Sequence, residues 1–319
     1  MSLFVRSSCY APAVKRPSIA IVGAGRLGTA LASRLASAGY SISEIIYRDN
    51  RRSLASMRGL ARQLGTRAST INAALLRADL VWFCVPDAAV SKSANQLSSK
   101  AWEEKVAFHS SGVLTSDALD VLREKGAAVA SVHPLMTFVS GAMPDLQGVT
   151  FAVEGDAQAI PVARKIVGHL GGDAVRLRKQ DKVVYHAFAT MICPLLVALL
   201  ATAEETAALA GIARTQARRR IVPIIRQTLA NYTKLGPAGS FSGPIVRGDV
   251  ATIRQHLKAL AKAPAVTNAY VALAKAALAY LPSQSKREIR DLLRTVSPER
   301  ILRNVKHTNP ASKRSTPRS

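Results

Sequence analysis

The sequence has 319 residues, 48% of them hydrophobic, which is long enough for two domains that each bury a core. Its net charge of +24 raises nucleic acid and acidic membranes as partners, but no RNA-binding or zinc-finger pattern accompanies the basic residues, so we expect no specific nucleic-acid binding. Its three cysteines, Cys9, Cys84 and Cys193, have no metal-like spacing; we expect neither a disulfide nor a metal site, and a reducing cytoplasm as the location.

Basic residues are concentrated at the two ends of the chain. Residues 1–17 contain no long apolar segment of the kind found in secretory signals, and we expect them to form a disordered basic lead-in. Residues 304–319 are rich in serine and basic residues and are expected to be a disordered tail. Nucleic-acid association through these ends is the weakest of the functional alternatives.

A short β-branched run at residues 19–22 predicts a buried strand, and a helix is expected from Thr29 to Ala38. Between them, Gly23, Gly25 and Gly28 have the G-x-G-x-x-G spacing of a dinucleotide-binding loop. The first glycine makes the turn, the second lets a pyrophosphate approach the backbone, and the third lets helix and strand pack closely. We therefore predict a cofactor site that includes the whole loop (Gly23, Ala24, Gly25, Arg26, Leu27 and Gly28).

The next strand is predicted to end at Tyr47, where the residue that reads the cofactor ribose belongs. Arg48 follows directly, and Arg51 or Arg52 is placed to bind a 2′-phosphate, which favours NADP. Asp49 keeps NAD open, since a carboxylate there would hold an unphosphorylated ribose.

Strands and helices alternate from this point to about residue 178. We expect helices at 53–64, at 87–97, at 116–125 and at 161–170, and strands at 78–86, 106–108, 128–132, 149–153 and 174–177. Such alternation predicts an α/β fold with a doubly wound parallel sheet, a Rossmann domain over residues 18–178. Val85 and Pro86 would lie at its carboxyl edge, beside the cofactor.

From Lys179 the pattern becomes helical, which predicts an all-α domain over residues 179–303 for substrate binding or dimerisation. Pro194 and Pro223 should kink or restart two of its helices, which are expected at 180–211, 214–234, 249–262, 265–280 and 285–295. Asp249 is a predicted N-cap, and Ser285 with Glu288 has the spacing of a capping box. The apolar run 187–203 is barely long enough to span a membrane and contains a proline, so we interpret it as a buried core or dimer helix.

Three polar clusters are candidates for the chemistry. Lys182 and His186 lie one turn apart on a predicted helix, where they could hold a substrate oxygen and move a proton, although a solvated helix face would show the same pair. Ser110, Ser111 and Gly112 follow a strand, and with His133 from a neighbouring strand end they could bind a substrate carboxylate; loop capping is the alternative. Arg247 could bind an anionic substrate or the cofactor phosphates, or pair with Asp249.

Together these motifs resemble those of Rossmann-like proteins that carry a C-terminal helical domain of unknown function. The motifs are Gly-Ala-Gly-Arg-Leu-Gly (23–28), His-Ser-Ser-Gly (109–112), Val-His-Pro-Leu (132–135), Tyr-His-Ala (185–187) and Gly-Pro-Ile-Val-Arg-Gly-Asp (243–249). The resemblance covers roughly residues 18–280 and extends to deazaflavin-dependent NADP reductases, pyrroline-5-carboxylate reductases and β-hydroxyacid dehydrogenases. It implies a nicotinamide cofactor and a helical domain that often builds a dimer.

In β-hydroxyacid dehydrogenases a lysine and an asparagine one turn apart act as acid/base and substrate holder. The resemblance places Lys182 at the lysine position, with His186 in place of the asparagine. We therefore expect an NADP-dependent oxidoreductase acting on a small carbonyl, hydroxy-acid or imine substrate, most simply as a homodimer. NAD or a deazaflavin is a less favoured cofactor, and a non-catalytic nucleotide sensor or scaffold is the alternative function.

Overall fold

The computed structural model describes residues 16–47 and 51–295, and the side chains of residues 51–53, 55 and 56 are not described. The predicted lead-in, apart from Arg16 and Pro17, and the predicted tail lie outside the described residues. The chain divides into two compact units between Cys193 and Pro194. This division lies beyond the boundary expected at residue 178, because the first long helix of the helical region inserts Lys182 against loops of the nucleotide-binding unit.

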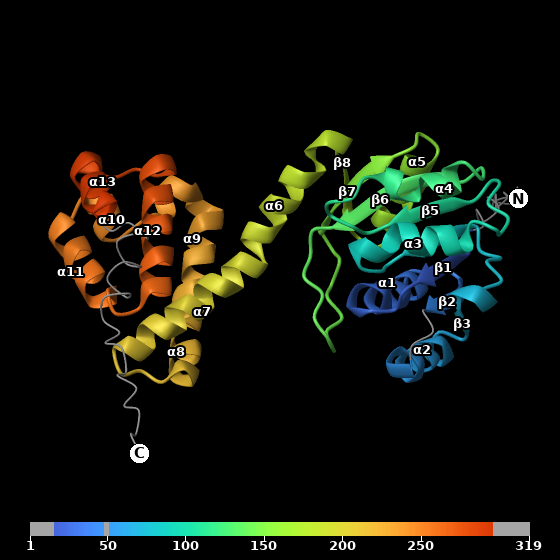
Figure 1. Ribbon diagram of the computed structural model, residues 1–319, viewed down its shortest axis with the longest axis horizontal. Coiled ribbons are helices and arrows are strands. Elements are labelled where there is room, and N and C mark those ends of the chain that lie inside the picture. Colours follow the sequence, from blue (N-terminus) through green and yellow to red (C-terminus); the bar gives the residue numbers. More distant parts are fainter. Residues whose placement is uncertain (1–15, 48–50, 296–319) are drawn as a thin grey trace, which may run out of the picture. The chain divides into compact units, whose positions relative to one another are not determined.

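The first unit is built on one eight-stranded sheet with the order β3-β2-β1-β4-β5-β6-β7-β8 (Figure 1). Its strands are β1 (Ile19–Val22), β2 (Ile42–Tyr47), β3 (Arg67–Thr70), β4 (Leu80–Phe83), β5 (Val106–His109), β6 (Ala128–Pro134), β7 (Thr150–Gly155) and β8 (Asp173–Arg176). Neighbouring strands are parallel except β6 and β7, which run antiparallel. The predicted α/β fold with a doubly wound parallel sheet is confirmed, and the sheet departs from parallel pairing between β6 and β7.

Two hydrophobic cores lie on opposite faces of the sheet, as the side-chain alternation of its strands requires. The helices of this unit are α1 (Arg26–Ser37), α2 (Arg51–Gln63), α3 (Asp87–Leu97), α4 (Asp120–Arg123), α5 (Ala159–His169) and α6 (Lys182–Ile192). Ile19 and Ile21 of β1 belong to one core with α1, α2 and α5, whereas Ala20 and Val22 belong to the other core with α3 and α4. Three 3-10 turns accompany them, η1 (Ile71–Ala73), η2 (Ser116–Leu119) and η3 (Lys179–Asp181).

The strand β3, which pairs with β2 at the edge of the sheet, was not predicted from the sequence. Its sequence Arg-Ala-Ser-Thr is short and largely polar, so no apolar pattern marks it. The strand is held through Glu44 of β2, a buried carboxylate that accepts hydrogen bonds from the Ser69 hydroxyl at 2.5 Å and the Leu76 N–H at 3.1 Å.

The second unit contains only helices among its described residues. They are α7 (Pro194–Leu209), α8 (Arg214–Arg220), α9 (Val222–Ser240), α10 (Pro244–Arg247), α11 (Val250–Leu260), α12 (Pro264–Tyr280) and α13 (Lys286–Arg294). Their core is formed mainly by α11, α12 and α13. Pro194 and Pro223 each lie in the first turn of a helix, as expected of residues that restart one.

The two predicted caps of this unit have different outcomes. Asp249 caps α11 by accepting the Thr252 N–H at 3.0 Å, which confirms that prediction. Ser285 precedes α13 in a left-handed conformation, φ +48°, and makes no side-chain capping hydrogen bond, so the capping-box prediction was wrong. A capping hydroxyl requires extended backbone geometry at its own residue, which the left-handed conformation does not provide.

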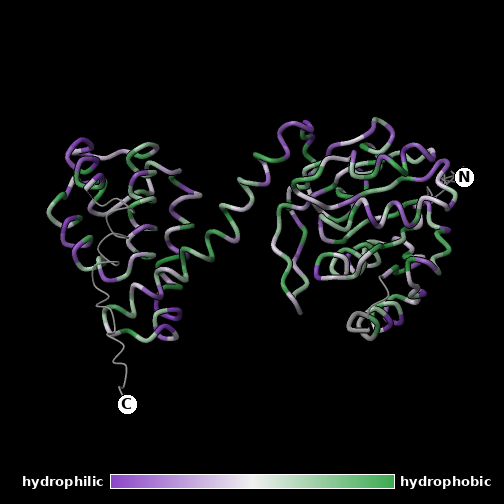
Figure 2. The backbone as a smooth tube through the Cα atoms, in the orientation of Figure 1, coloured by the Kyte–Doolittle hydropathy of each residue, from purple (hydrophilic) through white to green (hydrophobic). Residues whose placement is uncertain are grey.

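The apolar segment that begins α7 is exposed rather than buried. The stretch Lys179–Leu209 is long and apolar enough to cross a membrane by length and composition, and none of its most apolar window is buried. Figure 2 shows α6 and the first half of α7 as largely hydrophobic. The segment is therefore not buried within either unit, and a partner surface or a membrane segment would account for its apolar residues.

Candidate active site

The glycine loop after β1 leaves no room for side chains where it packs and leaves open space where a ligand would lie. A Cβ added to Gly28 would lie 1.9 Å from the carbonyl oxygen of Gly23, and one added to Gly23, whose φ is +90°, would lie 2.6 Å from Cγ1 of Val85. A Cβ at Gly25 would meet nothing within 4 Å. The first and third glycines are thus required by packing, and the second opens the backbone to a ligand.

The loop leads into α1, whose first turn carries no acidic residue and whose N-cap, Gly25, makes no side-chain capping bond. The N–H groups of this turn are therefore not used by a capping side chain, and the positive end of the helix dipole is not neutralised by a local carboxylate. These features fit the pyrophosphate of a dinucleotide.

Of the other residues predicted to bind the cofactor, some lie in or beside the glycine loop, and Arg48 and Arg51 have no described side chains. Ala24 is buried, Leu27 packs against the sheet core and Arg26 is exposed at the start of α1. Val85 and Pro86 follow β4, next to the glycine loop. Arg48 lies outside the described residues, and Arg51 begins α2 without a described side chain, so the proposed 2′-phosphate contacts stay predictions.

The loop after β5 is shaped by His109, which is fully buried. Its Nδ1 accepts the Ser111 N–H at 3.1 Å, and its Nε2 lies 2.9 Å from the Thr115 carbonyl oxygen. Because a carbonyl only accepts, Nε2 carries the proton and the ring is a neutral imidazole. Burial lowers the pKa of His109 to about 4, which agrees with that state.

The serine hydroxyls predicted to bind substrate are engaged within the fold. The Ser110 hydroxyl accepts the indole N–H of Trp82 at 2.8 Å, and the Ser111 hydroxyl accepts the N–H groups of Val113 at 3.2 Å and Leu114 at 2.9 Å. Both serines are buried. Their visible role is to fix the loop that presents Gly112.

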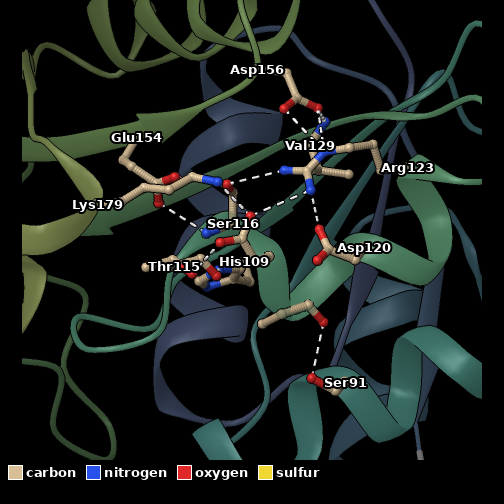
Figure 3. A network of polar contacts seen from close by, with 12 residues as sticks. Ser91, His109, Thr115, Ser116, Asp120, Arg123, Val129, Glu154, Asp156 and Lys179 are labelled. Atoms are coloured by element: carbon tan, nitrogen blue, oxygen red, sulfur yellow. Dashed lines mark hydrogen bonds and ion pairs between the residues drawn. The ribbon is translucent and has the colours of Figure 1, made fainter.

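A polar network anchors the far end of the same loop (Figure 3). The buried Glu154 carboxylate of β7 accepts the N–H of Ser116 at 2.9 Å and its hydroxyl at 2.7 Å. Arg123 donates from Nε to both oxygens of Asp156, each at 3.1 Å, and Lys179 forms an ion pair with Asp117. The antiparallel strand β7 thus contributes to the site by holding the loop in place.

Lys182, the first residue of α6, lies beneath the loop with 1% of its surface exposed. Its ammonium donates to the Ser131 hydroxyl at 2.7 Å and to the Ser111 carbonyl at 3.2 Å. Burial lowers its pKa from 10.5 to about 8, opposed by the charges of Glu154 and Asp87. The fold thus brings Lys182 against the Ser111 loop, but the amine has almost no access to solvent.

His186 and His133 meet over Gly112, where no side chain would fit. A Cβ on Gly112 would lie 2.3 Å from Cδ2 of His186 and 2.9 Å from Nε2 of His133. The two imidazole rings are 6.0 Å apart and nearly perpendicular. Burial, followed by the positive charge of Lys182, lowers the pKa of His133 to about 4, so its ring is neutral at pH 7.

Tyr185 and Ser131 were not among the sequence-predicted site residues. The Tyr185 hydroxyl lies 3.4 Å from Nδ1 of His133, and the two rings stand edge to face at 5.7 Å. Burial raises the pKa of Tyr185. Tyr185 could have been found from its place between Lys182 and His186, whereas Ser131 has no signal other than being a polar residue within a buried strand.

Arg247 lies in the second unit, at the end of α10, with an exposed side chain. No ion pair within the described part of the chain includes it, and the carboxylate of Asp249 is engaged by Thr252, its second oxygen accepting the Thr252 hydroxyl at 2.7 Å. An Arg247–Asp249 ion pair is therefore not formed, and the pKa of Asp249 is lowered mainly by the hydrogen bonds from Thr252, with a smaller effect from the charge of Arg247. Also within the described ranges, no group of three or more His, Cys, Asp or Glu side chains is placed to hold a metal ion.

Two family models match separate segments of the chain, and the second of these segments begins in the sheet of the first unit and extends into the helical unit. Residues 18–107 match the family described as NADP oxidoreductase, coenzyme F420-dependent, and residues 149–277 match a domain of unknown function, DUF2520. A search of curated proteins finds no match.

Solved structures share the fold over most of the chain. A putative NADP oxidoreductase from Bacteroides fragilis superimposes with a TM-score of 0.69 and 22% identity, covering 82% of this chain and 97% of its own. An imine reductase from Aspergillus terreus, in complex with NADPH4 and dibenz[c,e]azepine, gives 0.57 and 14%, covering 87% and 99%. A pyrroline-5-carboxylate reductase from Coxiella burnetii gives 0.55 and 13%, covering 82% and 98%.

At sequence identities of 13–22%, the similarity to these solved structures establishes the fold alone. The two family matches show that a segment similar to NADP oxidoreductases comes before a DUF2520 segment in the chain. With its glycine loop, its mostly parallel sheet and the helices that follow, the chain has a Rossmann-like fold in which a segment similar to NADP oxidoreductases precedes a segment similar to DUF2520.

Proposed function

We propose that this protein is a cytoplasmic NADP-dependent oxidoreductase that transfers hydride to or from a small carbonyl, hydroxy-acid or imine substrate. One observation carries the proposal: the glycine loop and the loop of Gly112 follow strands of the same parallel run, at the same carboxyl edge of the sheet. In open α/β sheets ligands bind at this edge. His133 and His186 pack against Gly112 of this loop, and imidazole rings are groups that can transfer a proton.

The residues that would hold the cofactor are those of the glycine loop. Gly23 and Gly28 shape the turn, Gly25 leaves the backbone accessible, and the first turn of α1 offers its N–H groups to the pyrophosphate. Arg48 and Arg51 would bind the 2′-phosphate, on the evidence of sequence position. When bound, the nicotinamide supplies or receives the hydride. A deazaflavin is the alternative cofactor that the name of the matching family keeps open.

Of the predicted catalytic pair, Lys182 and His186, only His186 is accessible to solvent and so to a substrate. Its side chain is partly exposed and lies against Gly112, whereas Lys182 is buried. We assign His186 the proton transfer to the substrate oxygen or nitrogen, and Lys182 the positioning of the Ser111 loop through its carbonyl. Neutral His133 keeps its ring between Tyr185 and Gly112, which supports a substrate-orienting role.

The first experiment is a calorimetric titration of the protein with NADPH and with NADH. We expect tighter binding of NADPH, loss of that preference in Arg48→Ala, and loss of both nucleotides in Gly28→Ala. Gly59→Ala is the matched control, since its added Cβ would meet nothing within 4 Å on α2 and should leave binding unchanged. Absence of binding by the wild type would refute the cofactor assignment.

A non-catalytic nucleotide sensor is the second candidate. It is favoured by one observation, that the Ser110 and Ser111 hydroxyls and the Lys182 ammonium are all engaged within the fold. The sensor predicts nucleotide binding without oxidation of NADPH over a panel of carbonyl and imine compounds. Turnover with any of them that is lost in His186→Ala would exclude it.

We further propose that the helical unit forms a homodimer through α7 and α9. Val197 on α7 and Ile224 on α9 are 63% and 66% exposed, and Leu195, Leu229 and Leu235 are more than half exposed. Exposed apolar residues on two separate helices of one unit favour a protein surface over a single spanning helix. The α7 residue Glu204 is also paired with Arg218, with Nη2 to Oε2 at 2.7 Å, which would be costly inside lipid.

Light scattering on the purified chain tests this surface. We expect a dimer for the wild type and a monomer for Ile224→Asp, with Tyr280→Asp on another exposed apolar residue as the control. A monomeric wild type that co-sediments with phospholipid vesicles would instead assign the apolar segment to a membrane.

A further inference from the structure

Three histidines lie at this edge of the sheet, and the fold uses their ring nitrogens to different extents. Both nitrogens of His109 bond to backbone groups of its own loop, so this ring has a structural role. His133 uses one nitrogen, Nδ1, which lies 3.4 Å from the Tyr185 hydroxyl. Among the residues that the structure describes, Nε2 of His133 and both ring nitrogens of His186 have no hydrogen-bond partner. These three nitrogens are therefore the ones open to a ligand.

The two nitrogens of His133 face different neighbours. Tyr185 lies beside Nδ1, and the two rings stand edge to face with their centroids 5.7 Å apart. Nε2 faces the loop after β5, 2.9 Å from the place where a side chain of Gly112 would begin. His133 is partly exposed and comes one residue before the end of β6, so Nε2 lies at the carboxyl edge, where ligands of open α/β sheets bind.

The hydrogen bond to Tyr185 decides which nitrogen of His133 carries the proton. A neutral imidazole has one N–H, and the partner of the other nitrogen selects the tautomer. A phenol is a stronger acid than a neutral imidazole N–H, and an imidazole nitrogen is a stronger base than a phenol oxygen. The pair is therefore most stable with Tyr185 donating to Nδ1, which leaves the ring proton on Nε2.

Both members of this pair keep their protons at neutral pH. Burial raises the pKa of Tyr185, so its phenol stays protonated and able to donate. Burial, followed by the charges of Lys182 and His186, lowers the pKa of His133 to about 4, against a smaller opposing effect of Asp87. At pH 7 the ring of His133 is thus neutral, and it donates a hydrogen bond without giving up its proton.

We propose that His133 is a substrate-binding residue in one fixed tautomer, whose Nε2–H donates a hydrogen bond to an acceptor atom of the substrate. Tyr185 is its positioning residue and acts only through Nδ1 of His133. This inference rests on the proposed function and adds the group that orients the substrate beside His186. No covalent bond forms or breaks at His133, and the proton transfer stays with His186.

Nuclear magnetic resonance of the full chain with ¹⁵N-labelled histidine tests the tautomer at pH 7. Long-range ¹H–¹⁵N spectra distinguish the two ring nitrogens, and His133→Gln identifies the signals of His133. We expect a proton on Nε2 in the wild type and a mixture of both tautomers in Tyr185→Phe, which loses only the hydroxyl.

Tyr270→Phe is the matched control for this experiment. The Tyr270 hydroxyl lies 3.1 Å from Nδ1 of His256 in the helical unit, with the rings also edge to face, so its loss should leave the signals of His133 unchanged. A proton on Nδ1 of His133 in the wild type, or a tautomer that does not respond to Tyr185→Phe, would overturn the inference and leave the oxidoreductase proposal in place.

Steady-state kinetics with NADPH test the contact with substrate, using whichever of pyruvate, cyclohexanone and 2-methyl-1-pyrroline is reduced fastest. His133→Phe keeps a ring without its nitrogens and should raise KM at least about fivefold, with a smaller loss of kcat, as expected for one lost hydrogen bond. His133→Gln keeps an N–H donor and should recover part of this loss, whereas His186→Ala should lower mainly kcat.

The kinetic outcomes separate this inference from the function on which it rests. A KM in His133→Phe equal to that of the wild type would overturn the substrate contact alone. Absence of NADPH oxidation with all three compounds would overturn the oxidoreductase proposal and, with it, the contact of His133 with a substrate.

Discussion

Replacing Lys182 with methionine should stabilise the first unit at neutral pH. Burial lowers the pKa of this lysine from 10.5 to about 8, so the folded state disfavours its charged form. One pKa unit corresponds to about 1.4 kcal/mol, which places the penalty at pH 7 at about 3 kcal/mol. Methionine fills nearly the same volume without a charge. The Ser111 carbonyl keeps a donor in the variant, because the Ser131 hydroxyl also reaches it at 3.2 Å.

The stability advantage of Lys182→Met should decrease as the pH rises. Between about pH 8 and 10.5 the unfolded chain holds the Lys182 proton more tightly than the folded chain, so folding stability rises with pH in this window. The penalty is fully present below pH 8 and disappears toward pH 10.5. The advantage of Lys182→Met, about 1–3 kcal/mol at pH 7 after the lost hydrogen bonds are subtracted, should therefore shrink at pH 9.5.

Urea unfolding followed by tryptophan fluorescence measures this effect in the relevant unit. Both tryptophans, Trp82 and Trp102, are buried in the first unit, so the signal does not report on the helical unit. Lys165→Met, on an exposed lysine, should change the free energy of unfolding by less than about 0.5 kcal/mol. A Lys182→Met protein that is less stable than wild type at pH 7, or whose difference from wild type does not change with pH, would refute the reasoning.

Three further predictions each concern a single substitution. Gly28→Ala should lower the unfolding free energy of the first unit by more than about 2 kcal/mol, because its Cβ would lie 1.9 Å from the Gly23 carbonyl oxygen; an unchanged urea midpoint would contradict this. Gly112→Ala should displace His186 and reduce kcat at least about tenfold while NADPH affinity, measured by calorimetry, stays at the wild-type value. Asp249→Ala should destabilise the helical unit by about 1 kcal/mol through loss of the α11 cap, and a thermal midpoint followed by circular dichroism that equals wild type would argue against the cap.

Local features of this protein could be predicted from the sequence because they depend on residues close together in the chain. The glycine spacing after β1 determines a turn that only glycine can make, and Asp249 caps a helix whose first N–H groups are three residues away. Pro194 cannot continue a helix and so begins a new one. Alternating apolar strands and helices are sufficient to predict the α/β class.

Features that depend on packing were decided by the tertiary structure. The spacing of Lys182 and His186 shows that both lie on one helix face, but not that this face meets the Ser111 loop and buries the amine while leaving the imidazole accessible. The direction of β7 and the contact between Tyr185 and His133 arise from segments far apart in the chain. A sequence pattern gives the periodicity of an element, whereas the partner of each face, and with it the burial and pKa of each site residue, is set by how the elements pack together.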